Sequence, residues 1–210
     1  KDYAENFADF MAAREPGQPF AFWYGGHEPH RAFKEGIGLE HGKKLADVVV
    51  PPFLPDSPEI RSDILDYCYE IEWFDQQLAK MIALLEEAGE LDNTIIVVTS
   101  DNGMSFPRAK ANMYEFGVHM PLAIRWGDKV SGGRTVEDLV SLIDLAPTFL
   151  EATGVKHPGE KYAAPPMTGT SLLSMLTGDG SGIVEPKRAA VYSARERHSS
   201  SRYKTLGYPQ

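Results

Sequence analysis

Two side chains with metal-binding chemistry, Asp101 and Asn102, follow directly after an apolar run at residues 95–98. The run is apolar at every position, which is typical of a strand that is covered on both faces in an α/β sheet. Ligand sites in such sheets lie just beyond the carboxyl ends of the strands. A carboxylate and an amide carbonyl are oxygen ligands, so the pair suits a hard divalent cation such as Ca²⁺ or Mg²⁺. The alternative is that these residues and Gly103 form only a turn.

A second apolar run, at residues 20–24, ends shortly before His27-Glu28-Pro29-His30. The proline and the preceding glycines exclude a helix, so both histidines lie on a loop. A histidine there could bind an anionic oxygen or donate a proton to a leaving group. The two could also be a zinc pair, although no further cysteine or histidine follows at suitable spacing. The third alternative is two histidines at the surface or the core edge without a chemical role.

Two cations, Arg108 and Lys110, follow Asp101 by seven and nine positions, so the chain could return them towards the end of the strand. A cation beside a metal is the arrangement that neutralises a tetrahedral anion such as phosphate or sulfate in a transition state. A solvated loop would carry the same two residues, and this alternative stays open.

Hydrophobic spacing predicts the elements that must position these residues. Residues 3–13 have helical spacing, and residues 20–24 predict a short aromatic strand. A long irregular loop at residues 32–57 precedes the longest predicted helix, which runs from a serine cap at 57 to a glycine at 89. Cys68 lies in the apolar stripe of this helix, so we expect a small buried residue rather than a nucleophile.

The second half of the chain continues the alternation of strands and helices. Pro147 interrupts one helical pattern, so we expect that helix to start anew near Asp144 and to end at Gly154. The predicted strands are residues 95–98, 121–126 and 189–192, and the predicted helices are residues 136–154 and 171–176. This order predicts an α/β fold with a mostly parallel sheet flanked by helices.

The composition sets limits on the class of protein. The 210 residues suffice for one domain or most of one, and a composition of 42% apolar and 24% charged residues argues against disorder and membrane spans. A net charge of −9 argues against nucleic-acid binding but leaves room for an anionic substrate beside local cations. The chain opens without an initiator methionine inside a helical pattern, so we expect a piece of a longer protein.

Several segments together resemble the sulfatases of the alkaline-phosphatase superfamily. They are residues 20–30, residues 99–103 with Lys110, and the Ser-Leu-Ile-Asp-Leu-Ala-Pro-Thr sequence at residues 141–148. Within this group, Phe106-Pro107 before Lys110, the Asn-Met-Tyr at 112–114 and the Glu-Pro-His-Arg at 28–31 are most similar to the heparan N-sulfatase (sulfamidase) type and its bacterial relatives. The resemblance extends over nearly the whole chain in the same order.

The resemblance implies roles for individual residues. Asp101 and Asn102 would be ligands of Ca²⁺, in preference to Mg²⁺. Lys110 would contact the sulfate, and His30 would bind it near the leaving atom, so these two are the expected catalytic residues. His27 and Arg108 are expected to bind substrate as neighbours of these positions.

A basic cluster near the end of the chain, which includes Arg195, Arg197 and His198, resembles the substrate-facing region of bacterial members. It would suit an acidic sugar, and a charged surface loop is the alternative. The resemblance also implies a sulfated carbohydrate substrate and a periplasmic, secreted or lysosomal location, whereas the oligomeric state does not follow from these residues.

The family's nucleophile is missing from the sequence. Sulfatases make formylglycine from the first residue of a Cys/Ser-x-Pro-x-Arg motif, and neither Cys68 nor any serine stands in one. The family's earlier aspartate ligands and its other lysine and histidine also precede the matched region. We therefore expect residues 1–178 to be the later part of a catalytic domain and residues 179–210 a linker and the start of a C-terminal subdomain. Formylglycine is expected in the missing N-terminal part, so this fragment alone should be inactive.

The sequence thus predicts part of a calcium-dependent sulfatase that hydrolyses sulfate esters or sulfamates of sulfated sugars of the glycosaminoglycan type. The first alternative is a phosphate- or phosphonate-ester hydrolase of the same superfamily. The second is a non-catalytic glycan- or metal-binding module, whose sign would be a complete protein without the modifiable cysteine or serine.

Overall fold

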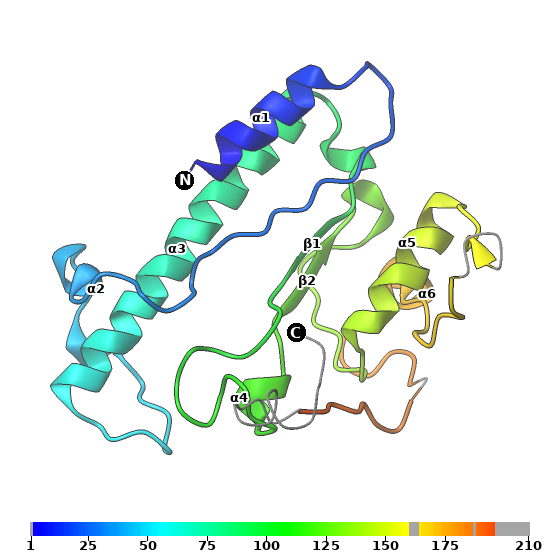
Figure 1. Cartoon of the computed structure of the whole chain (residues 1–210). Helices are drawn as coiled ribbons and strands as arrows, with labels where there is room; N and C mark the ends of the chain where they lie inside the picture. Colours follow the sequence, from blue (N-terminus) through cyan, green and yellow to red (C-terminus); the bar gives the residue numbers. More distant parts are fainter. Residues whose placement is uncertain (1, 160–163, 187, 196–210) are drawn as a thin grey trace, which may run out of the picture. The chain divides into compact units, whose positions relative to one another are not determined.

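The computed structural model describes residues 2–159, 164–186 and 188–195 (Figure 1). These residues form two compact units. The first unit comprises the chain up to residue 91 together with residues 99–122, and the second comprises residues 92–98 and the chain from residue 123. None of the described helices is both long and apolar enough to cross a membrane.

The first unit is built on one long helix, α3 (Pro58–Glu87), with α1 (Tyr3–Ala13) lying along it (Figure 1). Both helices start at the predicted places. The Ser57 hydroxyl accepts the N–H of Ile60 at 3.4 Å, and the Asp2 carboxylate accepts that of Glu5 at 3.0 Å. These side chains satisfy N–H groups that have no partner within the helix. The predicted loop at 32–57 contains the short helix α2 (Ile37–Glu40).

Two buried polar side chains of α3 hold the other helices in place. Gln77, which is 1% exposed, accepts the N–H of Ala4 at the start of α1 at 3.0 Å. Asp66, which is 2% exposed, accepts the N–H groups of Gly36 and Gly38 at the start of α2, both at 2.8 Å. A negative charge at a helix N-terminus is also favoured by the helix dipole. The packing of α1 and α2 on α3 is therefore fixed by hydrogen bonds inside the core.

The prediction of a strand at residues 20–24 is wrong, because the structure describes these residues and they form no strand. The segment is irregular and belongs to no strand pair of the described residues, and its rings pack on helices. The ring of Phe22 lies 4.8 Å from that of Phe7 on α1, and Tyr24 stacks on Phe74 of α3 at 4.6 Å between centroids. Residues 189–192, also predicted as a strand, are irregular too, and Tyr192 is almost fully exposed. Suitable side chains alone do not make a strand, which needs a hydrogen-bonded neighbour.

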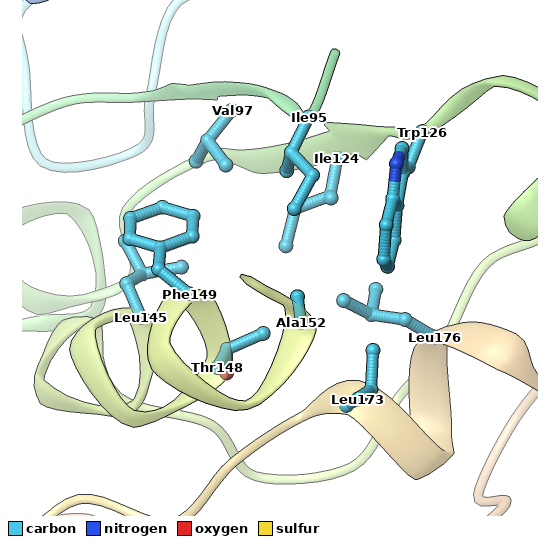
Figure 2. Close-up of a pocket in the computed structure, with 10 residues that line it drawn as sticks. All are labelled: Ile95, Val97, Ile124, Trp126, Leu145, Thr148, Phe149, Ala152, Leu173 and Leu176. Carbon is cyan, nitrogen blue, oxygen red and sulfur yellow. The ribbon is translucent and has the colours of Figure 1, made fainter. Parts of the chain in front are cut away.

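The second unit contains most of an antiparallel strand pair, β1 (Ile96–Thr99) and β2 (Leu122–Arg125), and the helices α5 (Leu145–Thr153) and α6 (Leu173–Thr177). Side chains from the strands and both helices gather around a cavity of about 10 Å³ (Figure 2). This space holds at most about one water molecule, and the lining is almost entirely apolar, so it is packed core rather than a ligand site. The lining residues are Ile95, Val97, Ile124, Trp126, Leu145, Thr148, Phe149, Ala152, Leu173 and Leu176.

Short helical turns complete the described elements. They are the 3-10 turns Leu45–Asp47, Leu91–Asn93, Gly127–Lys129 and Leu142–Asp144, and the α-helical turn α4 (Glu115–Val118). Residues 136–141 are not helical, contrary to the prediction, and helical structure starts only after Ser141. The reason is a reciprocal cap, in which the side chains of Ser141 and Asp144 each accept the other's backbone N–H.

Asp144 is fully buried and joins three segments of the second unit. Its carboxylate accepts the N–H groups of Ser141 and Thr170 at 2.7 and 2.8 Å and both terminal nitrogens of Arg188 at 2.6 and 2.8 Å. Thr148 extends the network, because its hydroxyl donates to the Asp144 carbonyl at 2.6 Å and accepts the N–H of Leu172 at 2.8 Å. Burial raises the pKa of Asp144, but the hydrogen bonds from Arg188, Thr170 and Ser141 outweigh it and hold the pKa below its usual value.

Replacing Asp144 with alanine should lower the free energy of unfolding by about 3–5 kcal/mol, because the Arg188 guanidinium and two N–H groups would lose their partner. Urea unfolding measures this loss. Asp92→Ala is the matched control, since Asp92 makes an exposed pair with Arg125 at 3.1 Å in the same unit. A far smaller loss is expected there. Equal losses in the two variants would contradict the role given to Asp144.

The lowered pKa of Asp144 also predicts sensitivity to acid. Its contribution to stability is fully present above the usual value of 3.8 and is lost as the pH falls through the lower pKa of the folded state. Urea unfolding at a series of pH values from 7 to about 2 should therefore show a fall in stability below about pH 4. In Asp144→Asn, which cannot ionise at this position, part of this fall should disappear, and an unchanged acid dependence would contradict the assignment.

Candidate functional site

The predicted site residues that the structure describes lie on two loops of the first unit. The histidine loop, residues 27–31, carries His27 and His30. The aspartate loop, residues 100–110, follows β1 and carries the other four, Asp101, Asn102, Arg108 and Lys110. Arg197 and His198 lie outside the described residues.

The histidine loop is a turn closed by the N–H of His30, which donates to the His27 carbonyl at 2.8 Å. The bond between Glu28 and Pro29 is cis. The two imidazole rings are exposed and stack at 5.0 Å between centroids. Nδ1 of His30 lies 2.9 Å from the Arg31 carbonyl, which can only accept, so this nitrogen carries a proton. Nε2 is thus the ring nitrogen left to bind an anion or to transfer a proton.

The histidine loop is held from α1 by Tyr3, and it contains a carboxylate, Glu28, that is partly buried. The Tyr3 hydroxyl accepts the N–H of His27 at 3.0 Å. One carboxylate oxygen of Glu28, Oε2, is buried without a hydrogen-bond partner among the described residues. Burial and the Glu28 charge raise the pKa of Glu70 on α3, and His27 lowers it. The Glu28 and Glu70 carboxylates and the His27 imidazole therefore lie within electrostatic range of one another.

The aspartate loop presents Asp101 exposed and Asn102 half-buried. The Ser100 hydroxyl donates to the backbone carbonyl of Asn102 at 2.6 Å and so fixes the turn after β1. Gly103 is buried against the chain near α4, and a Cβ there would lie 2.0 Å from the Phe116 carbonyl, so no side chain fits. Within the described residues the carboxylate of Asp101 and the amide of Asn102 have no hydrogen-bond or ion-pair partner, so both are available to a ligand.

The two cations of this loop also have no carboxylate partner in the part of the chain that the structure describes. Lys110 is exposed, and its backbone N–H donates to the Met104 carbonyl at 3.0 Å. Arg108 has a left-handed backbone, with φ of 62°, and its guanidinium lies 5.7 Å from the ring centroid of Tyr114. By contrast, ion pairs are made by Arg14, Arg31, Arg61, Arg125 and Arg188. The loop therefore carries uncompensated positive charge beside free oxygen ligands.

These ligands fit a hard cation, but they are only part of a metal site. Ca²⁺ takes about six to eight oxygen ligands, of which Asp101 and Asn102 supply two side chains. The described residues contain no group of three His, Cys, Asp or Glu side chains that could hold a metal ion.

Sequence reasoning missed the residues that support the loops. Tyr3, Glu28 and Arg31 all contact or belong to the histidine loop, and Arg31 also reaches the aspartate loop. Glu28 and Arg31 lie within two positions of His30 in the sequence, so this short motif could have indicated them. The contact of Tyr3 spans 24 positions, and nothing in local spacing indicates it.

Comparisons with known proteins show which family the chain matches. The sulfatase family model matches residues 1–155, and the model for the C-terminal part of N-sulphoglucosamine sulphohydrolase matches residues 108–203. The human N-sulphoglucosamine sulphohydrolase is 32% identical over 91% of this chain and 41% of its own length. The N-acetylglucosamine-6-O-sulfatase of Bacteroides thetaiotaomicron is 34% identical over 66% of this chain and 25% of its own length. The chain thus spans less than half the length of these curated relatives.

Solved structures agree with the family match. A protein in complex with its substrate D-glucosamine-2-N,6-O-disulfate is 30% identical, with a TM-score of 0.51 over 68% of this chain and 30% of that one. A structure solved in work on glycosaminoglycan metabolism by Bacteroides thetaiotaomicron has a TM-score of 0.69 over 88% of this chain and 39% of that one, and at 18% identity it shows the fold alone. The predicted α/β fold of the alkaline-phosphatase and sulfatase type is confirmed. The predicted mostly parallel sheet is not observed in the described residues, where β1 and β2 form one antiparallel pair. The chain belongs to the sulfatase family.

Proposed function

We propose that this chain is part of a calcium-dependent sulfatase that hydrolyses sulfate esters or sulfamates of sulfated sugars. The observation that carries the proposal is the aspartate loop of a sulfatase-family chain, in which oxygen ligands and unpaired cations occupy one short segment. The names of the relatives support the substrate class, since they include a sulphohydrolase of N-sulphoglucosamine and a 6-O-sulfatase of N-acetylglucosamine. The structure with a glucosamine disulfate supports it too.

In this proposal Asp101 and Asn102 hold one side of the Ca²⁺ ion. A bound Ca²⁺ would polarise the sulfate oxygens and the nucleophile. The ammonium of Lys110 contacts the sulfate and stabilises the negative charge that develops on it. His30 binds the sulfate through Nε2 near the leaving atom, where a protonated imidazole also supplies a proton. His27 and Arg108 add positive charge beside these groups.

The formylglycine that the family implies does not fit this chain. Its one cysteine, Cys68, is half-buried on α3, and burial raises the pKa of the thiol. A thiol of this kind is less reactive. We place the formylglycine, and the remaining metal ligands, in another part of the complete protein and derive no step through it.

The rest of the chain is assigned by the same resemblance. Residues 1–178 form the later part of the catalytic domain, and residues 179–210 are a linker and the start of a C-terminal subdomain. Arg197 and His198, which lie outside the described residues, are assigned by this resemblance to binding acidic groups of the sugar. A periplasmic, secreted or lysosomal location suits this activity, and one relative, from Drosophila melanogaster, is named as an extracellular sulfatase.

The function is tested by incubating the complete protein that contains this chain with N-sulfated glucosamine and with an aryl sulfate. Release of sulfate is expected, and it should stop when Ca²⁺ is removed by a chelator. The ratio of the two rates separates N-sulfatase from O-sulfatase activity. Release of phosphate from a phosphate ester, without sulfate release, would instead favour the phosphatase branch of the superfamily. No release from any substrate would favour a binding module.

Replacing Asp101 with asparagine in the complete protein should weaken Ca²⁺ binding and slow sulfate release. The expected loss is on the order of 10²-fold or more, because even residues that only orient metal ligands cost about 10- to 100-fold. Calorimetric titration with Ca²⁺ measures the affinity independently of turnover. Asp9→Asn is the control, since Asp9 is an exposed carboxylate of the same unit on α1. Unchanged affinity and turnover in Asp101→Asn would refute the metal assignment.

A further inference from the structure

Arg31 connects the histidine loop with both the aspartate loop and α3. Its two terminal nitrogens donate to the two carboxylate oxygens of Asp63 on α3, at 2.9 and 2.8 Å. Its Nε donates to the backbone carbonyl of Ser105 on the aspartate loop at 3.1 Å. All three nitrogens of the guanidinium are therefore engaged, and they join segments that lie 32 and 74 positions away in the sequence.

Aromatic rings cover the guanidinium of Arg31. Its central carbon lies 5.0 Å from the ring centroid of Phe106 and 5.2 Å from that of Phe33. Phe106 is only 5% exposed, and its ring packs edge-on against Tyr67 of α3 at 5.6 Å between centroids. The guanidinium thus lies close to a ring that is itself anchored on the long helix.

The segment that Arg31 contacts lies between the metal ligands and the sulfate-binding lysine. Ser105 and Phe106 follow Asn102 and precede Lys110. The carbonyl of Met104 accepts the N–H groups of both Phe106 and Lys110, at 2.8 and 3.0 Å, so the contacted residues and Lys110 share one hydrogen-bonded turn. A shift of Ser105 would therefore carry Lys110 with it.

The geometry favours a fixed orientation rather than general charge attraction. An exposed ion pair alone contributes little, and the side chain of Arg31 is 45% exposed. Here, however, two parallel hydrogen bonds to one carboxylate, a third to a carbonyl and contact with ring faces define the guanidinium in three dimensions. A lysine ammonium at the same position could not make this set of contacts.

We propose that Arg31 is a positioning residue that fixes the histidine loop relative to the aspartate loop, and so holds His30 and Lys110 at the spacing needed for one sulfate group. Asp63 orients Arg31 from α3. This proposal rests on the proposed function and assigns Arg31 no contact with the reacting atoms. A misplacement of about 1 Å at a reacting centre can cost on the order of 10²-fold in rate.

The test uses three variants of the complete protein, Arg31→Ala, Arg31→Lys and Asp63→Asn. Arg61→Ala is the matched control. Arg61 also contacts one carboxylate, that of Asp56, through two nitrogens, Nε and a terminal nitrogen, at 2.6 and 2.8 Å. Its other terminal nitrogen donates to the carbonyls of residues 45 and 48. It lies on α3, as Asp63 does, but it contacts neither loop. Hydrogen exchange of the amides at residues 103–110 and the kinetics of sulfate release, with kcat and KM separated, are measured for each variant.

Arg31→Ala should speed exchange in residues 103–110 and lower kcat by on the order of 10²-fold. Asp63→Asn should act in the same direction with a smaller effect, and Arg61→Ala should leave both measurements unchanged. Arg31→Lys retains the positive charge without the fixed geometry, so it should rescue little of the rate. Because Arg31→Lys is the least disruptive variant, its exchange rates and kcat test the positioning role if Arg31→Ala does not fold.

Three results would overturn the proposal. If the rate of amide exchange in residues 103–110 rises no more in Arg31→Ala than in Arg61→Ala, the contact between Arg31 and Ser105 does not hold the aspartate loop. Full rescue by Arg31→Lys, or a rise in KM with kcat unchanged, would show that the charge binds substrate directly. Absence of sulfate release by the unmodified protein would instead refute the proposed function, and the exchange comparison would still decide whether Arg31 holds the loop.

Discussion

The first unit depends on hydrogen bonds that one helix, α3, makes to the segments packed around it, two of its side chains doing so from inside the core. Burying the Asp66 carboxylate is costly unless donors replace the lost water, and the N–H groups of Gly36 and Gly38 do so. Gln77 makes the equivalent contact with α1, and Asp63 holds Arg31 of the histidine loop. Thus α1, α2 and the histidine loop are all positioned by one 30-residue helix.

The sequence predicted the helices well, because caps and apolar spacing are local signals. Ser57 marks the start of α3, and Gly154, with φ of 69°, directly follows α5 as expected. The same spacing could not show that Asp66 and Gln77 are the most buried polar residues of α3, whereas Ile71, an apolar residue of this helix, is 41% exposed. Those two side chains meet backbone groups of distant segments, and no periodicity within a helix contains that information.

The strands and the site show the same division between local and distant information. Residues 95–98 were recognised because an apolar run ends at Asp101 and Asn102, and β1 is observed there. Residues 20–24 have an equally apolar pattern but form no strand, since their rings pack on α1 and α3 instead. The contact between Arg31 and Ser105 could not be predicted, because it joins two loops by a single side chain.

Charged side chains that have hydrogen-bond partners hold the fold, whereas charged side chains without partners are available for chemistry. Asp144 accepts hydrogen bonds from four donors and has no capacity left for a ligand, so its charge serves the second unit alone. Asp101 has no such partner among the described residues, and a metal ion would satisfy it. The cations divide in the same way, since Arg31 and Arg188 each pair with a carboxylate whereas Lys110 is exposed without such a partner among the described residues. An anion-binding loop needs unsatisfied charges that nevertheless stay in place, and the satisfied charges next to them, above all Arg31, supply that rigidity.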